Sequence, residues 1–265
     1  MLRDITLGQY FPGKSFIHKL DPRTKILCVI IYIALIFCIK SFLGYAVLFL
    51  FTAFVVASSR IPAGFVLKGL KPIIMFVAIT AIFNLFLTDG KILWQWGFLK
   101  ITNEGLIAAI YMILRLFFLV LGTSLLTLTT SPIALTDGIE RLLSPLKKIG
   151  VPAHEFAMMM TIALRFVPTL LEETDKIIKA QTARGADFES GSIVNRAKAM
   201  IPILIPLFIS AFRRADDLAV AMECRCYRGG ENRTRLRELK TTYRDGVCWV
   251  TVLAFSALVL FANNL

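Results

Sequence analysis

Residues 8–15, GQYFPGKS, match G-x-x-x-x-G-K-[ST], the pattern of loops that hold nucleotide phosphates. That chemistry needs a strand that delivers the loop, consecutive backbone N–H groups around the phosphate, and a helix directly after the Lys-Ser pair. Only seven residues precede Gly8, Pro12 removes one N–H group from the loop, and Pro22 interrupts any helix that follows. No alternation of strands and helices follows that could supply an acidic partner motif. We therefore expect this chain to bind no nucleotide and no other cofactor.

Two short arginine motifs form a second set of residues with defined chemistry. TARGADFE (182–189) and MECRCYRGG (222–230) each place an arginine between small residues near the end of a predicted long helix. The helix dipole stabilises an arginine in a last turn, and a glycine after it ends the helix. Alternatively, small neighbours leave the guanidinium free to enter a groove on another protein and pair with a carboxylate there. The repetition makes docking a competitive interpretation. The candidate docking residues are Ala183, Arg184, Gly185, Cys224, Arg225 and Cys226.

Residues for other chemistries are sparse. His18 and His154 are the two histidines, and there is no H-E-x-x-H motif and no Ser-His-Asp set, so we expect neither a metal site nor a catalytic triad. Arg115 lies about ten residues into a predicted span and is either a functional intramembrane cation or a residue near the outer interface. The cysteines form no C-x-x-C pair, and we expect small buried apolar residues rather than a disulfide or metal site. They are Cys28, Cys38, Cys224, Cys226 and Cys248.

The elements that must position these residues are strongly apolar. The 265-residue chain is 57% hydrophobic with a mean hydropathy of +0.71, whereas soluble domains are about 45–50% apolar. Its long uncharged stretches predict an all-α polytopic membrane protein. The net charge of +12 fits Lys/Arg-rich loops beside anionic lipid better than nucleic acid. Five spans are expected, at 26–39, 42–58, 72–88, 106–130 and 247–262.

The Lys/Arg distribution predicts the orientation of these spans. The first 25 residues contain five Lys/Arg and the 59–71 loop contains three, whereas the stretch between them contains only Lys40. The N-terminus is therefore expected in the cytoplasm, and five spans place the C-terminus outside. Three regions are expected: a leader with the first four spans (1–130), a cytoplasmic coupling-helix region (131–246), and the last span with the C-terminus (247–265).

The 131–246 region carries 18 Lys/Arg and 14 Asp/Glu and is too long to be a loop. Helices are expected at 132–148, 153–184 and 191–228. Residues 199–212 are continuously apolar but contain two prolines, so we expect a helix lying on the membrane or on a partner helix; if they span, the topology downstream inverts.

Two apolar stripes in this region are expected to face each other. They are Phe156 to Leu171 on the first helix, and Ile201, Leu204, Phe208, Phe212, Leu218 and Met222 on the second. The Met158–Met160 run is either a deformable contact for a changing partner or ordinary core. The candidate partner-contact residues are Met158, Met159, Met160, Phe208 and Phe212.

The chain resembles the transmembrane T component of energy-coupling factor (ECF) transporters, which import vitamins and metals in prokaryotes. The leader GQYFPGKSFIHKLDPRTK (8–25) is similar to the start of that family, with its LDPRTK core before the first span. The two arginine motifs resemble the family's pair of Ala-Arg-Gly-like signatures, although Cys224 and Cys226 replace Ala and Gly in the second. The large helical region before the last span fits as well.

The resemblance implies an energy-coupling subunit that is not itself an enzyme, in the cell membrane. Two ATP-binding-cassette ATPases, which hold ATP and Mg²⁺, would each receive one coupling helix, with Arg184 and Arg225 in their grooves. A small membrane subunit that binds the substrate would pack against this chain. ATP hydrolysis would then drive that subunit to release its cargo, a vitamin or other micronutrient, inward.

Two other classes of protein compete with this interpretation. One is a membrane-embedded enzyme acting on lipid through Arg115 or the cluster at 213–217, although a nucleophile or metal set is missing. The other is a stand-alone carrier, although the spans at 26–39 and 42–57 have almost no polar residues. Neither the substrate nor the number of substrate-binding partners follows from the sequence.

Overall fold

The computed structural model describes residues 10–88, 90–96, 99–188, 192–229 and 239–264. The chain forms two compact units, which we call the bundle (residues 8–138 and 238–265) and the insert (residues 139–237). The bundle contains α1 (Pro22–Cys38), α2 (Phe42–Ser59), α3 (Ala63–Lys68), η2 (Lys71–Ile73), α4 (Ile74–Leu87), β1 (Ile92–Trp96), β2 (Leu99–Thr102), α5 (Asn103–Thr129) and α9 (Tyr243–Asn264). Helix α6 (Pro132–Leu143) leads into the insert, which contains η3 (Ser144–Ile149), α7 (Ala153–Ala183) and α8 (Ile193–Cys224).

Side-chain caps determine where three of the bundle helices begin. Asp21 accepts a hydrogen bond from the N–H of Arg23 at the start of α1, and Pro22 takes the first helical position. Ser41 caps α2 and Thr102 caps α5 in the same manner, each accepting an N–H three residues later. The apolar runs therefore become helices with defined first turns.

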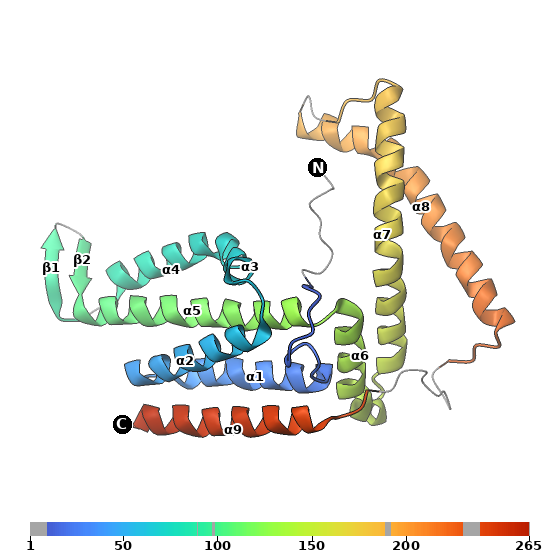
Figure 1. Ribbon diagram of the computed structural model, residues 1–265. Coiled ribbons are helices and arrows are strands. Elements are labelled where there is room, and N and C mark those ends of the chain that lie inside the picture. The colour runs from blue at the N-terminus through green and yellow to red at the C-terminus, as the bar shows by residue number, and fades with distance from the viewer. Residues whose placement is uncertain (1–9, 89, 97–98, 189–191, 230–238, 265) are drawn as a thin grey trace. The chain divides into compact units, whose positions relative to one another are not determined.

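Helices α1, α2, α5 and α9 lie side by side and enclose the core of the bundle (Figure 1). The fully buried side chains at its centre include Ile36, Leu48 and Val259. The Tyr32 hydroxyl hydrogen-bonds with Thr52 Oγ1 at 3.0 Å, and its oxygen lies 3.3 Å from the Phe118 carbonyl oxygen. This contact joins α1, α2 and α5 at one point inside an apolar environment, where an unpaired hydroxyl would be costly.

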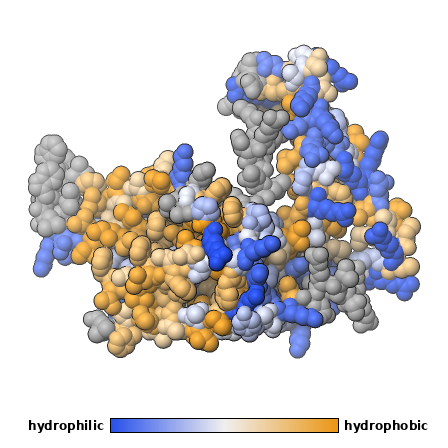
Figure 2. Space-filling model, viewed as in Figure 1, coloured by the Kyte–Doolittle hydropathy of each residue, from blue (hydrophilic) through white to orange (hydrophobic). Residues whose placement is uncertain are grey.

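The prediction of an all-α polytopic membrane protein is confirmed. By length and composition, α2, α5, α8 and α9 of the described residues can cross a membrane, and α4 is a shorter apolar helix. Figure 2 shows hydrophobic residues over most of the visible bundle surface, with smaller groups of hydrophilic residues among them. All five predicted spans are helices, although α1 has 17 residues and α4 has 14. One departure is the antiparallel hairpin of β1 and β2, which the sequence did not predict.

The insert is dominated by α7 and α8, which contact each other. Helix α7 has 31 residues and α8 has 32, and their bounds agree with the helices predicted at 153–184 and 191–228 to within a few residues. Pro202 and Pro206 lie inside α8, which is unbroken but changes direction along its length (Figure 1). Proline removes a backbone hydrogen bond and bends a helix, so this change of direction has a local cause.

Candidate functional site

Helix α7 ends in a motif centred on Arg184. Arg184 is the C-cap residue of α7 (φ −88°, ψ 7°), and Gly185 follows in the left-handed region at φ +87°. The N–H of Ala186 donates to the carbonyl of Gln181 at 3.0 Å, and that of Gly185 donates to Thr182 at 3.0 Å. These two bonds define a Schellman motif, which pairs carbonyls that the helix leaves open. A Cβ on Gly185 would meet no atom, so glycine is favoured there by its dihedral angle and not by a lack of space.

Helix α8 ends in the same geometry around Arg225. Arg225 has φ −91° and ψ 13°, and Cys226 follows at φ +56°. The N–H of Tyr227 donates to Met222 at 3.0 Å, and that of Cys226 donates to Glu223 at 2.8 Å. The two sequence motifs therefore repeat in backbone conformation residue by residue. Cys226 adopts a left-handed conformation that costs a non-glycine residue about 1 kcal/mol or more.

Both arginines are exposed, as are the small residues Ala183, Gly185 and Cys226 beside them. Among the described residues, neither guanidinium forms an ion pair. Each therefore presents a cation at the negative end of a long helix dipole, where the dipole stabilises it. The structure thus supports the capping interpretation and leaves both guanidinium groups accessible to a carboxylate of another molecule.

An apolar crevice of about 250 Å³ lies between α7 and α8 within the insert. Its α8 side is made largely of alanines, and its α7 side includes Phe166 and Leu170. At the edge of the crevice, Arg214 Nη2 lies 2.7 Å from Glu173 Oε2. Hydrogen bonding from Ser210, and then from Arg214, lowers the pKa of Glu173. The alanines on the α8 side are Ala211, Ala215 and Ala219.

The prediction that the apolar stripes of α7 and α8 face each other holds for one end of the α8 stripe and is wrong for the rest. Leu218 and Met222 line the crevice, but the bulky residues further along α8 are exposed. The alanine face of α8 therefore lies toward α7 across the crevice, and the larger apolar residues are exposed. The exposed stripe on α8 consists of Ile201, Leu204, Ile205, Phe208, Ile209 and Phe212.

The predicted partner-contact residues are mostly exposed. On α7, Met159 and Met160 are about half exposed and Met158 is partly buried. On α8, Phe208 is 60% and Phe212 is 68% exposed. Large apolar side chains in a continuous exposed stripe mark an interaction surface. The docking and contact roles of these residues stay predictions.

The leader has a structural role that the sequence did not reveal. One part of this role belongs to Lys25. The Lys25 ammonium donates to the Thr129 carbonyl at 2.9 Å, to Thr130 Oγ1 at 3.3 Å and to the His18 carbonyl at 3.3 Å. Thr129 ends α5, just before the chain continues into α6. Lys25 therefore binds the connection between α5 and α6, the helix through which the chain continues into the insert. Neutral oxygens satisfy the three N–H groups of this buried cation.

The same leader also binds the segment that returns from the insert. The N–H of Asp21 donates to Asp245 Oδ1 at 2.9 Å, and Arg23 Nη2 donates to the Leu239 carbonyl at 3.1 Å. Asp245 Oδ2 accepts the N–H of Thr242 at 2.7 Å and so supports the start of α9. Residues 21–25, DPRTK, thus join both crossings between bundle and insert, and we call this group of contacts the crossing clamp.

An ion pair inside the clamp holds Asp21 in its charged form. Arg23 Nη2 lies 2.8 Å from Asp21 Oδ2. Burial raises the pKa of Asp21, but hydrogen bonds and charge from Arg23 outweigh burial and keep that pKa below its ordinary value. The carboxylate therefore remains an acceptor for the first turn of α1 at neutral pH.

The part of GQYFPGKS that the structure describes, residues 10–15, contains no strand and leads into turns. Ser15 is buried, and its Oγ lies 2.6 Å from His18 Nδ1. His18 Nε2 lies 3.0 Å from the Phe11 carbonyl, which can only accept, so Nε2 carries the hydrogen and Nδ1 accepts from Ser15. Burial lowers the pKa of His18, which favours this neutral form. The serine that would bind Mg²⁺ in a nucleotide loop is thus held by the leader itself. Gly8 and Gln9 lie outside the described residues.

Arg115 lies near the middle of α5, twelve residues after its first residue. Its guanidinium carbon is 5.6 Å from the centre of the Phe37 ring of α1, a cation–π contact. Its Nε is buried without a hydrogen-bond partner among the described residues. Its central place in α5 favours the intramembrane interpretation over the interfacial one.

The expectation that the cysteines are buried apolar residues is wrong. Cys38, Cys224 and Cys226 are exposed, and Cys28 and Cys248 are half-buried. The last two lie on different helices with their sulfur atoms 3.7 Å apart. Spacing along the sequence gave no sign of this pair, because 220 residues separate its members.

Apolar helices of spanning length, together with an insert whose two long helices end in matching exposed arginine motifs, define a polytopic α-helical membrane protein. The family described as "Cobalt transport protein" (CbiQ) matches residues 13–236. The chain belongs to this family.

Curated relatives are similar over nearly the whole chain. An energy-coupling factor transporter transmembrane protein EcfT of Ruminiclostridium cellulolyticum is 60% identical over 261 residues, which is 98% of each chain. The protein of the same name from Bacillus subtilis is 50% identical over 98% of this chain and 99% of its own length. That from Listeria innocua is 46% identical over the full length of both. The resemblance to the transmembrane component of ECF transporters is confirmed, and these relatives are bacterial membrane proteins of a transporter rather than enzymes.

Proposed function

We propose that this chain couples ATP hydrolysis in two partner ATPases to the movement of a substrate-binding membrane subunit of an ECF-type importer. The ATPases are of the ATP-binding-cassette type and bind ATP and Mg²⁺. The cargo is a vitamin or another micronutrient, carried by the substrate-binding subunit. The chain itself serves as the mechanical connection between them.

The observation that carries this proposal is the pair of matching helix ends. Arg184 and Arg225 occupy the same position of the same Schellman motif, and both are exposed. Two equal ends suit two copies or two homologues of one kind of partner. A docked guanidinium can transmit force along a helix only if that helix is packed, and α7 packs against α8 beside the Arg214–Glu173 pair.

The open apolar stripe of α8 supports the proposed contact with the substrate-binding subunit. Phe208 and Phe212 belong to it, and Met159 and Met160 add a second exposed apolar group on α7. The subunit that these side chains would contact is itself a membrane protein with apolar helices. Methionine side chains adapt to partners of different shape, which suits a contact that changes during transport.

The proposal places ATP and Mg²⁺ in the partners and no cofactor in this chain. The hydrogen bond between Ser15 and His18 and the turns that follow support this, because they occupy the residues that a phosphate loop would need. The proposed topology has the N-terminus and the 131–246 region in the cytoplasm, with α8 as part of the platform. The Lys/Arg-rich leader supports that orientation.

Charge reversal at the helix ends tests the proposal. A charge-assisted hydrogen-bonded pair contributes about 2 kcal/mol, so Arg184→Glu or Arg225→Glu should weaken binding of one ATPase on the order of 30-fold. The double variant should retain neither ATPase through affinity purification and should lose vitamin uptake in cells that depend on it. The chain should still reach the membrane at the wild-type level.

Arg196→Glu is the matched control, because Arg196 is an exposed arginine in the first turn of α8, at the opposite end from Arg225. It should copurify with both ATPases and support normal uptake. Wild-type uptake in the double variant would refute the docking role, and equal loss in the Arg196 variant would reduce it to a general charge effect.

A further inference from the structure

Two cysteines that the proposed function does not use lie together between α1 and α9. Cys28 is in the second turn of α1, Cys248 is in the second turn of α9, and their Sγ atoms are 3.7 Å apart. A disulfide bond is about 2.05 Å long, so the sulfurs need to approach by only about 1.7 Å. Both side chains are half-buried and therefore partly accessible to reagents.

A hydrogen bond near the two cysteines fixes the helices that carry them. The hydrogen bond from Asp21 to Asp245 joins the starts of α1 and α9 at 2.9 Å. Cys28 follows Asp21 by about two helical turns, and Cys248 follows Asp245 by about one. The two thiols therefore belong to helices whose separation is set by the crossing clamp, and α1 and α9 contact each other.

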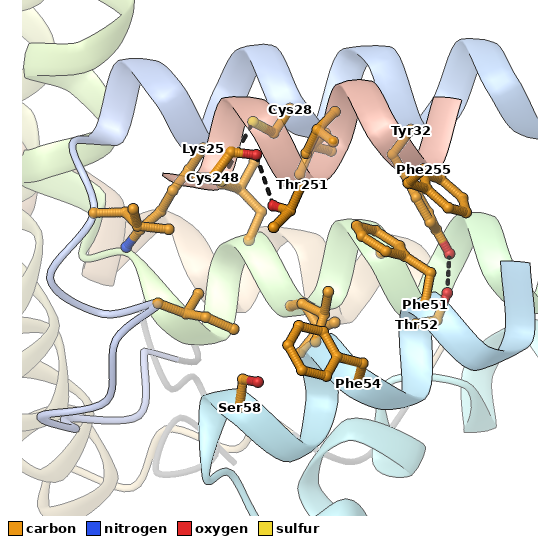
Figure 3. A pocket seen from close by; sticks show the side chains of 18 of the residues that line it. Lys25, Cys28, Tyr32, Phe51, Thr52, Phe54, Ser58, Cys248, Thr251 and Phe255 are labelled. Carbon is orange, nitrogen blue, oxygen red and sulfur yellow. Dashed lines mark hydrogen bonds between the residues drawn. The ribbon is translucent and has the colours of Figure 1, made fainter. Parts of the chain in front are cut away.

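The space beside the pair allows the sulfurs to turn toward each other. Both cysteines line an apolar cavity of about 360 Å³ within the bundle, together with Lys25, Tyr32 and Phe255 (Figure 3). Side chains on the wall of a cavity change rotamer without displacing packed neighbours. We therefore expect side-chain rotation at this cavity wall to supply the remaining approach of about 1.7 Å.

We propose that Cys28 and Cys248 are a reversible thiol–disulfide pair that joins α1 to α9 covalently when it is oxidised. The oxidant is a low-molecular-weight disulfide. The thiolate of one cysteine attacks it, forming a mixed disulfide and releasing one small thiol; the second cysteine then attacks the mixed disulfide and releases the other. The protein loses two protons and two electrons, and the small disulfide becomes two thiols. In a reducing cytosol the pair remains a dithiol.

The other cysteines lack this geometry. Cys38 is exposed at the end of α1, and Cys224 and Cys226 flank Arg225 at the end of α8. Among the five cysteines, all of which the structure describes, Cys28 and Cys248 are the pair with sulfurs close enough for contact. Cys38 is exposed and lies on a different part of α1 from the pair, so it forms a mixed disulfide with a small oxidant. It therefore reports whether the oxidant has reached the protein.

The test uses the purified full-length chain in detergent, treated with oxidised glutathione and digested without reduction. Mass spectrometry should detect one peptide pair joined through Cys28 and Cys248, two hydrogens lighter than the two free peptides, and dithiothreitol should release it. Cys38 should carry glutathione in the same sample. Glutathione on Cys38 without any joined pair would overturn the proposal.

Single serine variants supply the controls and a second measurement. Cys28→Ser and Cys248→Ser should yield no joined peptide, whereas the matched variant Cys38→Ser should yield it as the wild type does. Oxidation should raise the melting temperature of the wild type and of Cys38→Ser by several degrees, and leave Cys28→Ser and Cys248→Ser unchanged. An equal rise in the variants without the pair would show that the disulfide does not fix the α1–α9 contact and would overturn that part of the proposal.

Discussion

Removal of the Asp245 carboxylate should destabilise the bundle measurably. Asp245 is 4% exposed and accepts two N–H groups, from Asp21 at 2.9 Å and from Thr242 at 2.7 Å. In Asp245→Ala the buried N–H of Asp21 loses its partner, which costs about 2–3 kcal/mol, whereas the exposed N–H of Thr242 regains water and costs about 0.5–1 kcal/mol. The sum is about 3 kcal/mol, which corresponds to a fall of about 6–12 °C in melting temperature for a unit of this size.

The assay is thermal unfolding of the purified chain in detergent, followed by tryptophan fluorescence. Trp249 lies one helical turn from Asp245 and reports on the start of α9. Asp245→Asn retains one acceptor oxygen and should lose about half as much. Asp216→Ala, at an exposed position of α8, should change the melting temperature by less than about 2 °C. Equal melting temperatures for Asp245→Ala and the wild type would refute the assignment of Asp245 to the crossing clamp.

Two further predictions concern the helix ends and the leader. Gly185→Ala places a Cβ at φ +87° and should cost about 1 kcal/mol, so the backbone amides at the end of α7 should exchange with solvent deuterium about fivefold faster. Cys226→Gly should slow the exchange at the end of α8, because it removes the cost of a left-handed non-glycine residue. Equal exchange in the wild type and both variants would contradict the strain assigned to Cys226. Burial holds the pKa of His18 below its ordinary value of about 6.5. The contribution of neutral His18 to stability is therefore complete above pH 6.5 and is lost as the pH falls from 6.5 toward the folded-state pKa. The melting temperature should fall more between pH 8 and pH 5 for the wild type than for His18→Gln, and parallel profiles would contradict the role of neutral His18.

The helices could be predicted because their signals are local. Apolar runs predicted the five long bundle helices α1, α2, α4, α5 and α9, although α1 begins at Pro22, four residues before the predicted span. The arginine motifs were found in the same way, since a small residue, an arginine and a small residue at a helix end form a pattern of adjacent positions. The same Schellman hydrogen-bond pattern at both ends shows that the repeat is structural.

Contacts between distant residues could not be predicted. Lys25 and Thr129 are 104 residues apart, and Cys28 and Cys248 are 220 apart, so no spacing rule relates them. A lysine before an apolar run ordinarily extends toward the membrane interface, so the sequence gives no sign that Lys25 binds the end of α5. Its actual partners depend on how α1 packs against α5.

The faces of α8 illustrate a different limit. Hydrophobicity ranks Phe208 and Phe212 above alanine for burial, and the sequence placed them both in the stripe facing α7 and among the candidate partner contacts. In the structure Ala211 and Ala215 line the crevice toward α7, whereas the two phenylalanines are exposed. An apolar pattern shows that a face avoids water without showing whether it meets its own chain or another molecule.

The crossing clamp also bears on how the chain can be divided. Both segments that connect the bundle with the insert are bound by the crossing clamp. Lys25 binds the segment that leads out, and Asp21 and Arg23 bind the segment that returns. A chimera in which the segment between positions 130 and 239 comes from a homologue would have both of its junctions at the crossing clamp. Residues 21–25 would then decide whether a foreign insert is accepted, although they lie outside the exchanged sequence. The compatibility of such chimeras should follow the match between leader and joints more closely than the overall identity of the two parents.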